Sequence, residues 1–143
     1  MSRRYIGVDP GLVTGIAVYE AGVRFNSYEL TRGQIMGFLR QIVCEGDIVV
    51  VERYVISAQT IKKTRQNDAM QVTGAVQELC REKSAHFILH EPAPAKRIGS
   101  NDVLKALKWD RITKDNHAND AAALVLMGLL KTNHTEYARL IGL

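Results

Sequence analysis

Residues 5–19 read Tyr-Ile-Gly-Val-Asp-Pro-Gly-Leu-Val-Thr-Gly-Ile-Ala-Val-Tyr, and this stretch decides the fold. Its first apolar run ends at Asp9 and is broken by Pro-Gly, which predicts a buried strand followed by a turn. A second strand is predicted at 14–19, and a third follows at 23–30 after a short turn. The chain therefore opens as an antiparallel meander with an acid at the end of its first strand.

The rest of the chain alternates helical and extended patterns. The run Ile-Val-Val-Val-Glu at 48–52 is typical of a strand that is covered on both faces. The other predicted elements, in order, are a helix capped by Thr31, a long helix at 57–83, a short strand at 87–89, a Pro-rich turn at 91–94, and helices at 102–108 and 116–131. A meander followed by parallel crossovers predicts an α/β fold whose five-stranded mixed sheet is flanked by helices.

Composition limits the possible classes of protein. The 143 residues contain no repeat and no linker, so we expect one domain over residues 1–143. Hydrophobic residues at 46% and charged residues at 24% exclude disordered and coiled-coil chains. The longest apolar run, at 121–130, is too short for a membrane span, and Asp9 and Pro10 interrupt any signal peptide. Cys44 and Cys80 lack metal-ligand spacing, read best as small hydrophobic residues in helices, and suit a reducing, cytoplasmic location.

Acidic residues occur at the ends of two predicted strands and at the start of the last helix. Asp9 and Glu52 meet at one sheet edge if their strands are neighbours, and His117 and Asp120 share one face of their helix. Three carboxylates and an imidazole together favour Mg²⁺ or Mn²⁺. Purely structural roles stay open for these residues, because Asp9 also suits a turn and the His117–Asp120 pair also suits the start of a helix.

Basic residues are concentrated in the middle of the chain. Residues 53–114 contain 12 Lys/Arg and 6 Asp/Glu, whereas the remainder contains 7 and 9. A positive stretch beside an acidic cluster is expected where a metal site borders a surface that binds a polyanion, although such asymmetry also arises by chance.

The motifs resemble those of RuvC-type Holliday junction resolvases of the RNase H-like superfamily, and the chain looks most like the short phage-encoded members. The matching pieces, in order, are Ile6-Gly-Val-Asp-Pro-Gly11 with Thr14-Gly15, Val49-Val-Val-Glu52, Gln71-Val-Thr-Gly74, Lys96, and His117-Ala-Asn-Asp-Ala-Ala122. The resemblance implies an RNase H-like fold and a junction endonuclease in the cytoplasm of a bacterium or a phage-infected host. By that resemblance the catalytic and metal-binding residues are Asp9, Glu52, His117 and Asp120, with Lys96 as an active-site lysine and a pair of Mg²⁺ or Mn²⁺ ions.

The sequence departs from the family at several places: the chain is short for the bacterial enzyme, and the interval from Glu52 to Gly74 is longer than usual by about one helical turn. Val55, with Tyr54 beside it, stands where the family has an aromatic residue that helps to part bases. A second family lysine, expected after Gly99-Ser100, is absent, and Lys105 is the nearest substitute.

The expected partners are branched DNA and a second copy of the chain, with no membrane. A homodimer is expected because a four-way junction needs two symmetric cuts and one chain carries one acidic cluster. The long helix, with Ile56, Ile61, Met70 and Val72, is the predicted interface, although for some of these residues a role in the core is the stronger expectation. The predicted DNA contacts are Tyr54, Lys62, Lys63, Arg65, Lys96, Arg97, Lys105 and Lys108, with Arg111 and Lys114 nearby.

Three rival functions remain open at this level. Actin-like ATPases and sugar kinases also begin with a strand-end Asp and a Thr-Gly, but they need two such domains. An RNase H-like domain that only binds nucleic acid would have lost its metal ligands, whereas Asp9, Glu52, His117 and Asp120 are all present. A nuclease acting on RNA, flaps or forks would have the same residues.

Overall fold

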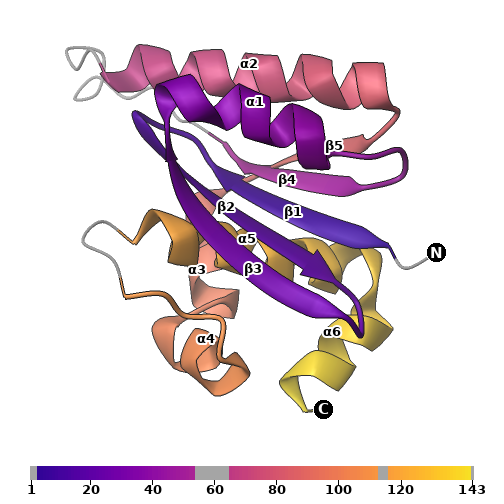
Figure 1. The fold of residues 1–143 in the computed structure, drawn as a ribbon. Helices are drawn as coiled ribbons and strands as arrows, with labels where there is room; N and C mark the ends of the chain where they lie inside the picture. Colours follow the sequence, from indigo (N-terminus) through magenta and orange to yellow (C-terminus); the bar gives the residue numbers. More distant parts are fainter. Residues whose placement is uncertain (1–2, 54–64, 113–115, 143) are drawn as a thin grey trace.

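The computed structural model describes residues 3–53, 65–112 and 116–142, which form three layers (Figure 1). Helices α1 and α2 cover one face of the sheet, and α5 covers the other together with α3, α4 and α6. None of the helices in these ranges is both long and apolar enough to cross a membrane. The elements are β1 (Arg4–Asp9), β2 (Val13–Glu20), β3 (Arg24–Thr31), α1 (Arg32–Ile42), β4 (Ile48–Glu52), α2 (Arg65–Lys83), β5 (His86–His90), α3 (Pro92–Ile98), α4 (Asn101–Leu107), α5 (His117–Thr132) and α6 (His134–Ile141).

The sheet has the strand order β3-β2-β1-β4-β5. The first three strands are antiparallel neighbours, whereas β4 pairs parallel with β1 and β5 pairs parallel with β4. This arrangement confirms the predicted α/β fold with a five-stranded mixed sheet flanked by helices. Because β1 and β4 run side by side in the same direction, their carboxyl ends emerge together.

Alternate residues along the strands enter two separate cores. Ile6 and Val8 of β1 pack with α1 and α2, whereas Tyr5 packs with α5. Side chains alternate between the two faces of the sheet in β4 as well, where Val49 and Val50 enter different cores. Both faces of the central strands are therefore buried, which explains their continuous apolar sequence.

Helix α5 is the centre of one core, and it approaches the sheet closely. Every residue from 118 to 129 is buried except Asp120, which is partly exposed. A Cβ atom on Gly7 would overlap the carbonyl oxygen of Ala121, and one on Gly15 would overlap the carbonyl oxygen of His117. Two strand glycines thus leave the space that the helix backbone occupies, and they set how near the first turn of α5 lies to β1 and β2.

Two predictions about local structure were wrong, and one helix was not predicted. The Pro-rich segment predicted as a turn at 91–94 is the start of helix α3, because Pro92 and Pro94 lie in its first turn, where no backbone N–H is needed. Helix α6 was not predicted, and none of its residues is fully buried. Cys44 is exposed in the loop after α1 rather than inside a helix, whereas Cys80 is buried in α2 as expected.

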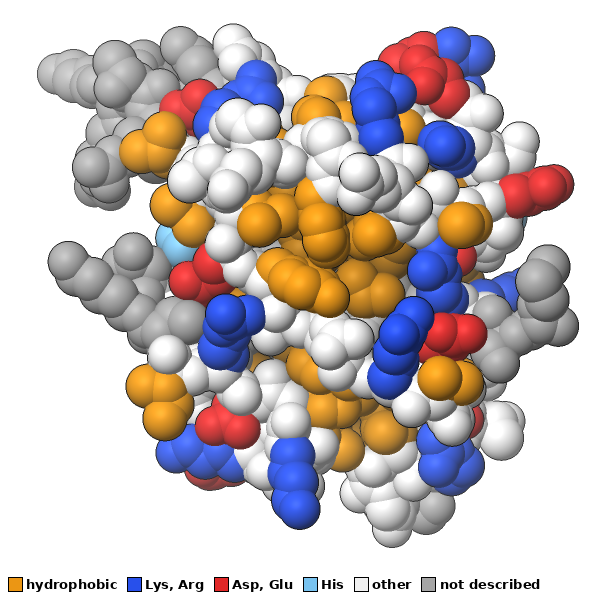
Figure 2. All heavy atoms as spheres, in the orientation of Figure 1, with side chains coloured by type: hydrophobic (Ala, Val, Ile, Leu, Met, Phe, Trp, Pro, Cys, Tyr) orange, Lys and Arg blue, Asp and Glu red, His pale blue; other side chains and the backbone are white. Residues whose placement is uncertain are grey.

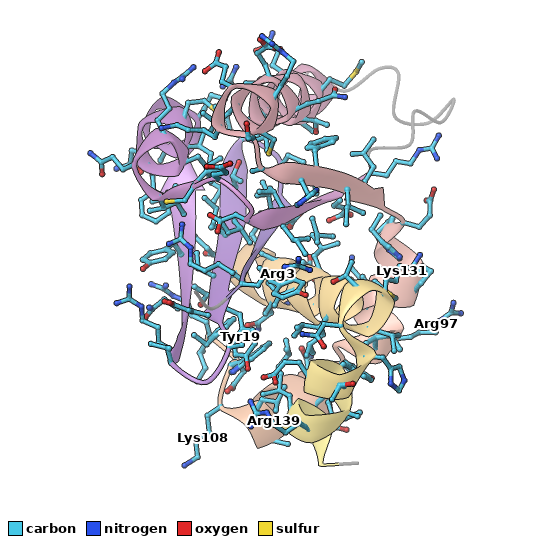
Figure 3. The ribbon with its side chains drawn as sticks, turned by 90° about the vertical axis from the view of Figure 1, so that its right-hand side faces the viewer. Arg3, Tyr19, Arg97, Lys108, Lys131 and Arg139 are labelled. Atoms are coloured by element: carbon cyan, nitrogen blue, oxygen red, sulfur yellow. The ribbon has the colours of Figure 1, made fainter. Side chains whose placement is uncertain are left out.

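Helix α6 is attached to β2 by a polar contact over an aromatic cluster. The Tyr19 hydroxyl donates to Glu136 at 2.6 Å, and Glu136 also accepts from Arg139 at 2.9 Å. Figure 3 shows Tyr19 and Arg139 on this side of the molecule, and Arg139 lies 3.4 Å from the Tyr19 hydroxyl. Beneath them, Trp109 stacks on Phe25 with ring centroids 4.2 Å apart. The hydrogen bonds from Arg139 and Tyr19 lower the pKa of Glu136 to about 2.

We therefore expect Glu136→Gln to destabilise the protein in a pH-dependent way. A carboxylate with a lowered pKa stabilises the folded state above its unfolded pKa of about 4.5, and that stabilisation is lost as the pH falls towards about 2. In thermal unfolding, the difference between wild type and variant should be largest at neutral pH and should disappear in acid. A difference that is independent of pH would show that the charge of Glu136 does not hold α6.

Candidate active site

One row of residues across the sheet carries the predicted carboxylates. Asp9 ends β1 and Glu52 ends β4, and the pairing of Val8 with Val51 places the two acids at the next position of neighbouring strands. Since Gly7 faces α5, Asp9 two residues later faces α5 as well. Continuing to both edges of the sheet, this row, which we call the acidic row, consists of Glu29, Gly15, Asp9, Glu52 and His90.

The first turn of α5 brings His117 and Asp120 to the same place. The Asp9 carboxylate accepts a hydrogen bond from Nδ1 of His117 at 3.1 Å. Asp120 lies one turn further along the same helix face, and the Lys96 ammonium of α3 is 3.8 Å from its Oδ2 atom. Glu52 is hydrogen-bonded to Asp9. All five residues predicted as catalytic therefore meet at one edge of the sheet.

Ionising all the acids of this cluster at once is energetically unfavourable. Burial raises the pKa of Glu52 to about 9, and the hydrogen bond and negative charge of Asp9 act in the same direction. Burial also raises the pKa of Asp120, again supported by Asp9, while Lys96 and His117 oppose the rise. Because one lysine offsets three carboxyl groups, additional positive charge would stabilise their ionised forms.

Two residues that sequence analysis missed fix the first turn of α5. Glu29, on the edge strand β3, accepts a hydrogen bond from the backbone N–H of Ala118 at 3.0 Å. A carboxylate at a helix N-terminus satisfies an otherwise unpaired donor and complements the helix dipole. The side chain of Asn119, which is buried, accepts from the Arg111 N–H at 2.8 Å and donates to the Arg111 carbonyl at 3.1 Å. His117 and Asp120 are thus held from both sides.

A cavity of about 400 Å³ opens beside the cluster. Its lining includes Lys96 and Asp120, and Ser100, Asn101 and Asn116 supply further polar atoms.

His90, the neighbour of Glu52 in β5, was not predicted as part of the site. Its ring is buried, and its Nδ1 atom lies 2.9 Å from the carbonyl oxygen of Glu91. The only sequence signal for these residues is their closeness to a predicted site residue along the chain.

The donor set fits a hard divalent cation. Three carboxylates and one imidazole face a common edge, and oxygen ligands with a histidine suit Mg²⁺ or Mn²⁺. Within residues 3–53, 65–112 and 116–142, no three His, Cys, Asp or Glu side chains are already spaced to hold a metal ion. Asp9 instead contacts Glu52 and His117. A bound cation would therefore replace these contacts between side chains.

The predicted DNA contacts are only partly placed. Tyr54, Lys62 and Lys63 lie outside the described residues, as do Val55 and Lys114, and Arg65 is described only as the first residue of α2. Lys96 belongs to the cluster. Lys105 is exposed on α4, and Figure 3 shows Arg97 and Lys108 extending away from the body of the protein in different directions. Arg111 donates to the backbone oxygen of Ser27 at 2.6 Å.

Figure 2 shows acidic side chains and a histidine exposed side by side at the left of the molecule, the end at which β1 and β4 finish in Figure 1. Blue side chains of lysine and arginine occur below this group. The side chains of His117 and Asp120 are themselves 31% and 28% exposed, so the cluster is reachable from solvent.

The sequence matches no protein-family model and no curated protein. Among solved structures, the chain is similar to RuvC of Thermus thermophilus in complex with a Holliday junction substrate, with a TM-score of 0.61, 18% identity and 96% of each chain covered. A second structure of Thermus thermophilus RuvC is similar with a TM-score of 0.59, at the same identity and coverage. The Holliday junction resolvase of fowlpox virus is similar with a TM-score of 0.57 and 11% identity, over 90% of this chain and 99% of the viral one. The chain thus has the fold of RuvC and of the viral Holliday junction resolvase.

Proposed function

We propose that this protein is a metal-dependent endodeoxyribonuclease that cleaves Holliday junctions and related branched DNA. The observation that carries the proposal is the convergence of Asp9, Glu52, His117, Asp120 and Lys96 from four separate elements at one sheet edge. The fold shared with RuvC and with the viral resolvase supports the same substrate class. A serine or cysteine nucleophile is not part of the proposal, because the cluster supplies acids, an imidazole and an ammonium group.

The residues take distinct roles in phosphodiester hydrolysis. Asp9, Glu52, His117 and Asp120 would hold a pair of divalent cations, which supply an activated water and stabilise the entering and leaving oxygens. Asp9 contacts both Glu52 and His117, which supports the proposal that it would be the central ligand of the site. Lys96 lies beside Asp120 and would stabilise the negative charge that develops on the phosphate.

Basic side chains at the border of the cluster would hold the DNA backbone. Arg97 and Lys105 are exposed on α3 and α4, the helices that line the cavity beside Asp120, and Lys108 is exposed at the carboxyl end of α4, further from the cluster. Contacts of this kind position a duplex without reading its sequence and weaken as salt concentration rises. The cavity beside Lys96 and Asp120 lies in the size range of small-ligand sites and would admit the nucleotide next to the cut.

We also propose that two copies act together. A chain with one acidic cluster makes one cut, whereas resolving a four-way junction needs two symmetric cuts, and a twofold dimer supplies them. Of the predicted interface residues on α2, Met70 is 49% exposed and is available for contact, whereas Val72 is buried in the core. Ile56 and Ile61 lie outside the described residues.

Cleavage of a panel of nucleic acids tests the proposed function. The panel contains a four-way junction, a fork, a flap, a linear duplex and an RNA–DNA hybrid, each assayed with Mg²⁺, with Mn²⁺ and with a chelator. We expect paired nicks in the junction with either ion, no products with the chelator, and much slower cleavage of the duplex. Preference for the RNA hybrid would reassign the substrate, and binding without cleavage under every condition would contradict the nuclease.

A further inference from the structure

His90 is a buried residue of the acidic row that has no role in the proposed function. It ends β5, its Cα atom is paired with that of Glu52 at the end of β4, and it is 6% exposed. Ile88, two positions earlier, packs into the core around α5, so the His90 side chain faces α5 as well. Glu52 faces the same way, because Val50 belongs to that core. The register therefore places the His90 ring beside the Glu52 carboxyl group, on the side away from Asp9.

The two nitrogens of the His90 ring have different surroundings. Nδ1 lies 2.9 Å from the carbonyl oxygen of Glu91. Because a carbonyl oxygen only accepts, Nδ1 carries the hydrogen, and the neutral ring then has a lone pair on Nε2. Among the residues that the structure describes, none makes a hydrogen bond with Nε2. A buried acceptor without a partner destabilises a folded protein unless a ligand binds to it.

Histidines that bind metal ions have this arrangement. The neutral ring binds the cation through one nitrogen, and its other N–H donates to a carboxylate or a backbone carbonyl, which fixes the orientation of the ring. The Glu91 carbonyl supplies that second contact for His90. Glu52 supplies an oxygen ligand at the adjacent position of the sheet. The two side chains thus offer one nitrogen and one carboxyl group on the same face.

We propose that His90 is a further ligand of the cation site, which binds through Nε2 together with Glu52, and that it makes the site prefer a transition-metal ion to Mg²⁺. The inference rests on the proposed function, which places cations at Asp9, Glu52, His117 and Asp120. His90 adds a second imidazole to that set. Mg²⁺ prefers oxygen ligands, whereas Mn²⁺ accepts imidazole and Co²⁺ binds it more tightly. The two histidines therefore favour a cation that the carboxylates alone would not select.

Isothermal titration calorimetry with Mg²⁺, Mn²⁺ and Co²⁺, in the absence of DNA, tests this preference. In His90→Asn the shorter amide can still donate to the Glu91 carbonyl, but no atom takes the place of Nε2. In His90→Gln an amide oxygen can extend towards that place, and it is a ligand that Mg²⁺ accepts. The matched control is His86→Asn, because His86 is an exposed histidine at the opposite end of β5 from His90.

We expect His90→Asn to bind Mn²⁺ about tenfold more weakly than wild type and Co²⁺ more weakly still, with the Mg²⁺ affinity changed less than about twofold. His90→Gln should keep the Mg²⁺ affinity and lose the preference for Mn²⁺, whereas His86→Asn should match wild type. Equal weakening for all three cations would show a purely structural role, and either that result or an unchanged Mn²⁺ affinity would overturn the proposal.

A spectroscopic measurement covers the case in which the His90 variants do not fold. In His117→Asp a carboxylate replaces the imidazole, so an imidazole nitrogen coupled to bound Mn²⁺ in pulsed electron paramagnetic resonance would come from His90. We expect this coupling, and its absence would refute the proposed ligand. A Mn²⁺ preference that depends on His90 without cleavage of any member of the panel would leave the ligand in place and refute the nuclease. Cleavage with a cation preference that is independent of His90 would do the reverse.

Discussion

Replacing Asp9 with asparagine is expected to lower the rate of junction cleavage at least about 100-fold, while junction binding stays close to that of wild type. Asp9 is the one member of the cluster that contacts both Glu52 and His117, so its replacement would remove a central ligand of the proposed cation site. Under the proposed function, other residues would hold the backbone phosphates, which is why binding should survive. Single-turnover cleavage and a gel-shift assay measure the two effects separately.

The control for this variant is Glu45→Gln, which also removes one carboxylate. Glu45 is exposed in the loop before β4, at the end of the sheet opposite to Asp9, and its replacement should leave cleavage unchanged. A metal readout that does not depend on activity completes the experiment. Mg²⁺ should raise the melting temperature of wild type and of Glu45→Gln, but less that of Asp9→Asn, because a ligand of the folded state stabilises it. Wild-type cleavage by Asp9→Asn would refute the assignment of the cluster.

Replacing Gly15 with alanine is expected to impair both folding and activity, although Gly15 has no side chain to take part in chemistry. The added methyl group would overlap the carbonyl oxygen of His117, which is backbone and cannot rotate away. Overpacking of this kind costs about 1–3 kcal/mol of folding free energy. The first turn of α5 would have to move outward, and a displacement of about 1 Å at a reacting centre lowers rates about 100-fold.

Gly37→Ala is the matched substitution for that experiment. Gly37 lies in α1, and a Cβ atom there meets no other atom within 4 Å. Alanine should therefore stabilise the helix by about 0.5–1 kcal/mol, with cleavage unchanged. Denaturant unfolding and single-turnover cleavage of both variants provide the comparison. If Gly15→Ala had the same free energy of unfolding and the same cleavage rate as wild type, the close packing of α5 on β2 would be wrong.

Much of the sheet was predictable because its signals are local. A run of apolar residues ending in an acid marks the buried strands β1 and β4, and Pro-Gly after Asp9 marks the first turn. The apolar stretch that starts at Ala121 likewise predicted a buried helix with a polar first turn. These signals suffice to place Asp9, Glu52, His117 and Asp120 at element ends, and the pairing of β1 with β4 confirmed that Asp9 and Glu52 meet.

The residues that support the cluster were not predictable, because their roles depend on register and packing. Glu29 reaches α5 only because β3 pairs with β2 so that Glu29 is level with Gly15. In the sequence Asn119 is an ordinary helix residue, and only the structure shows that its side chain accepts a hydrogen bond from the backbone of Arg111. Helix α3 was hidden by its prolines, which are turn residues elsewhere and acceptable only in a first helical turn. Each case needs a contact between distant parts of the chain.

The acidic row has a consequence for laboratory evolution. A carboxyl group whose pKa is raised by burial, as in Glu52, makes the folded state less stable at neutral pH than a neutral side chain of the same shape would. Selection for heat resistance alone would therefore favour an amide at Glu52, and under the proposed function such variants would be more stable but inactive. Screens for a more stable variant of this protein therefore need to measure catalytic activity and thermal stability in the same round.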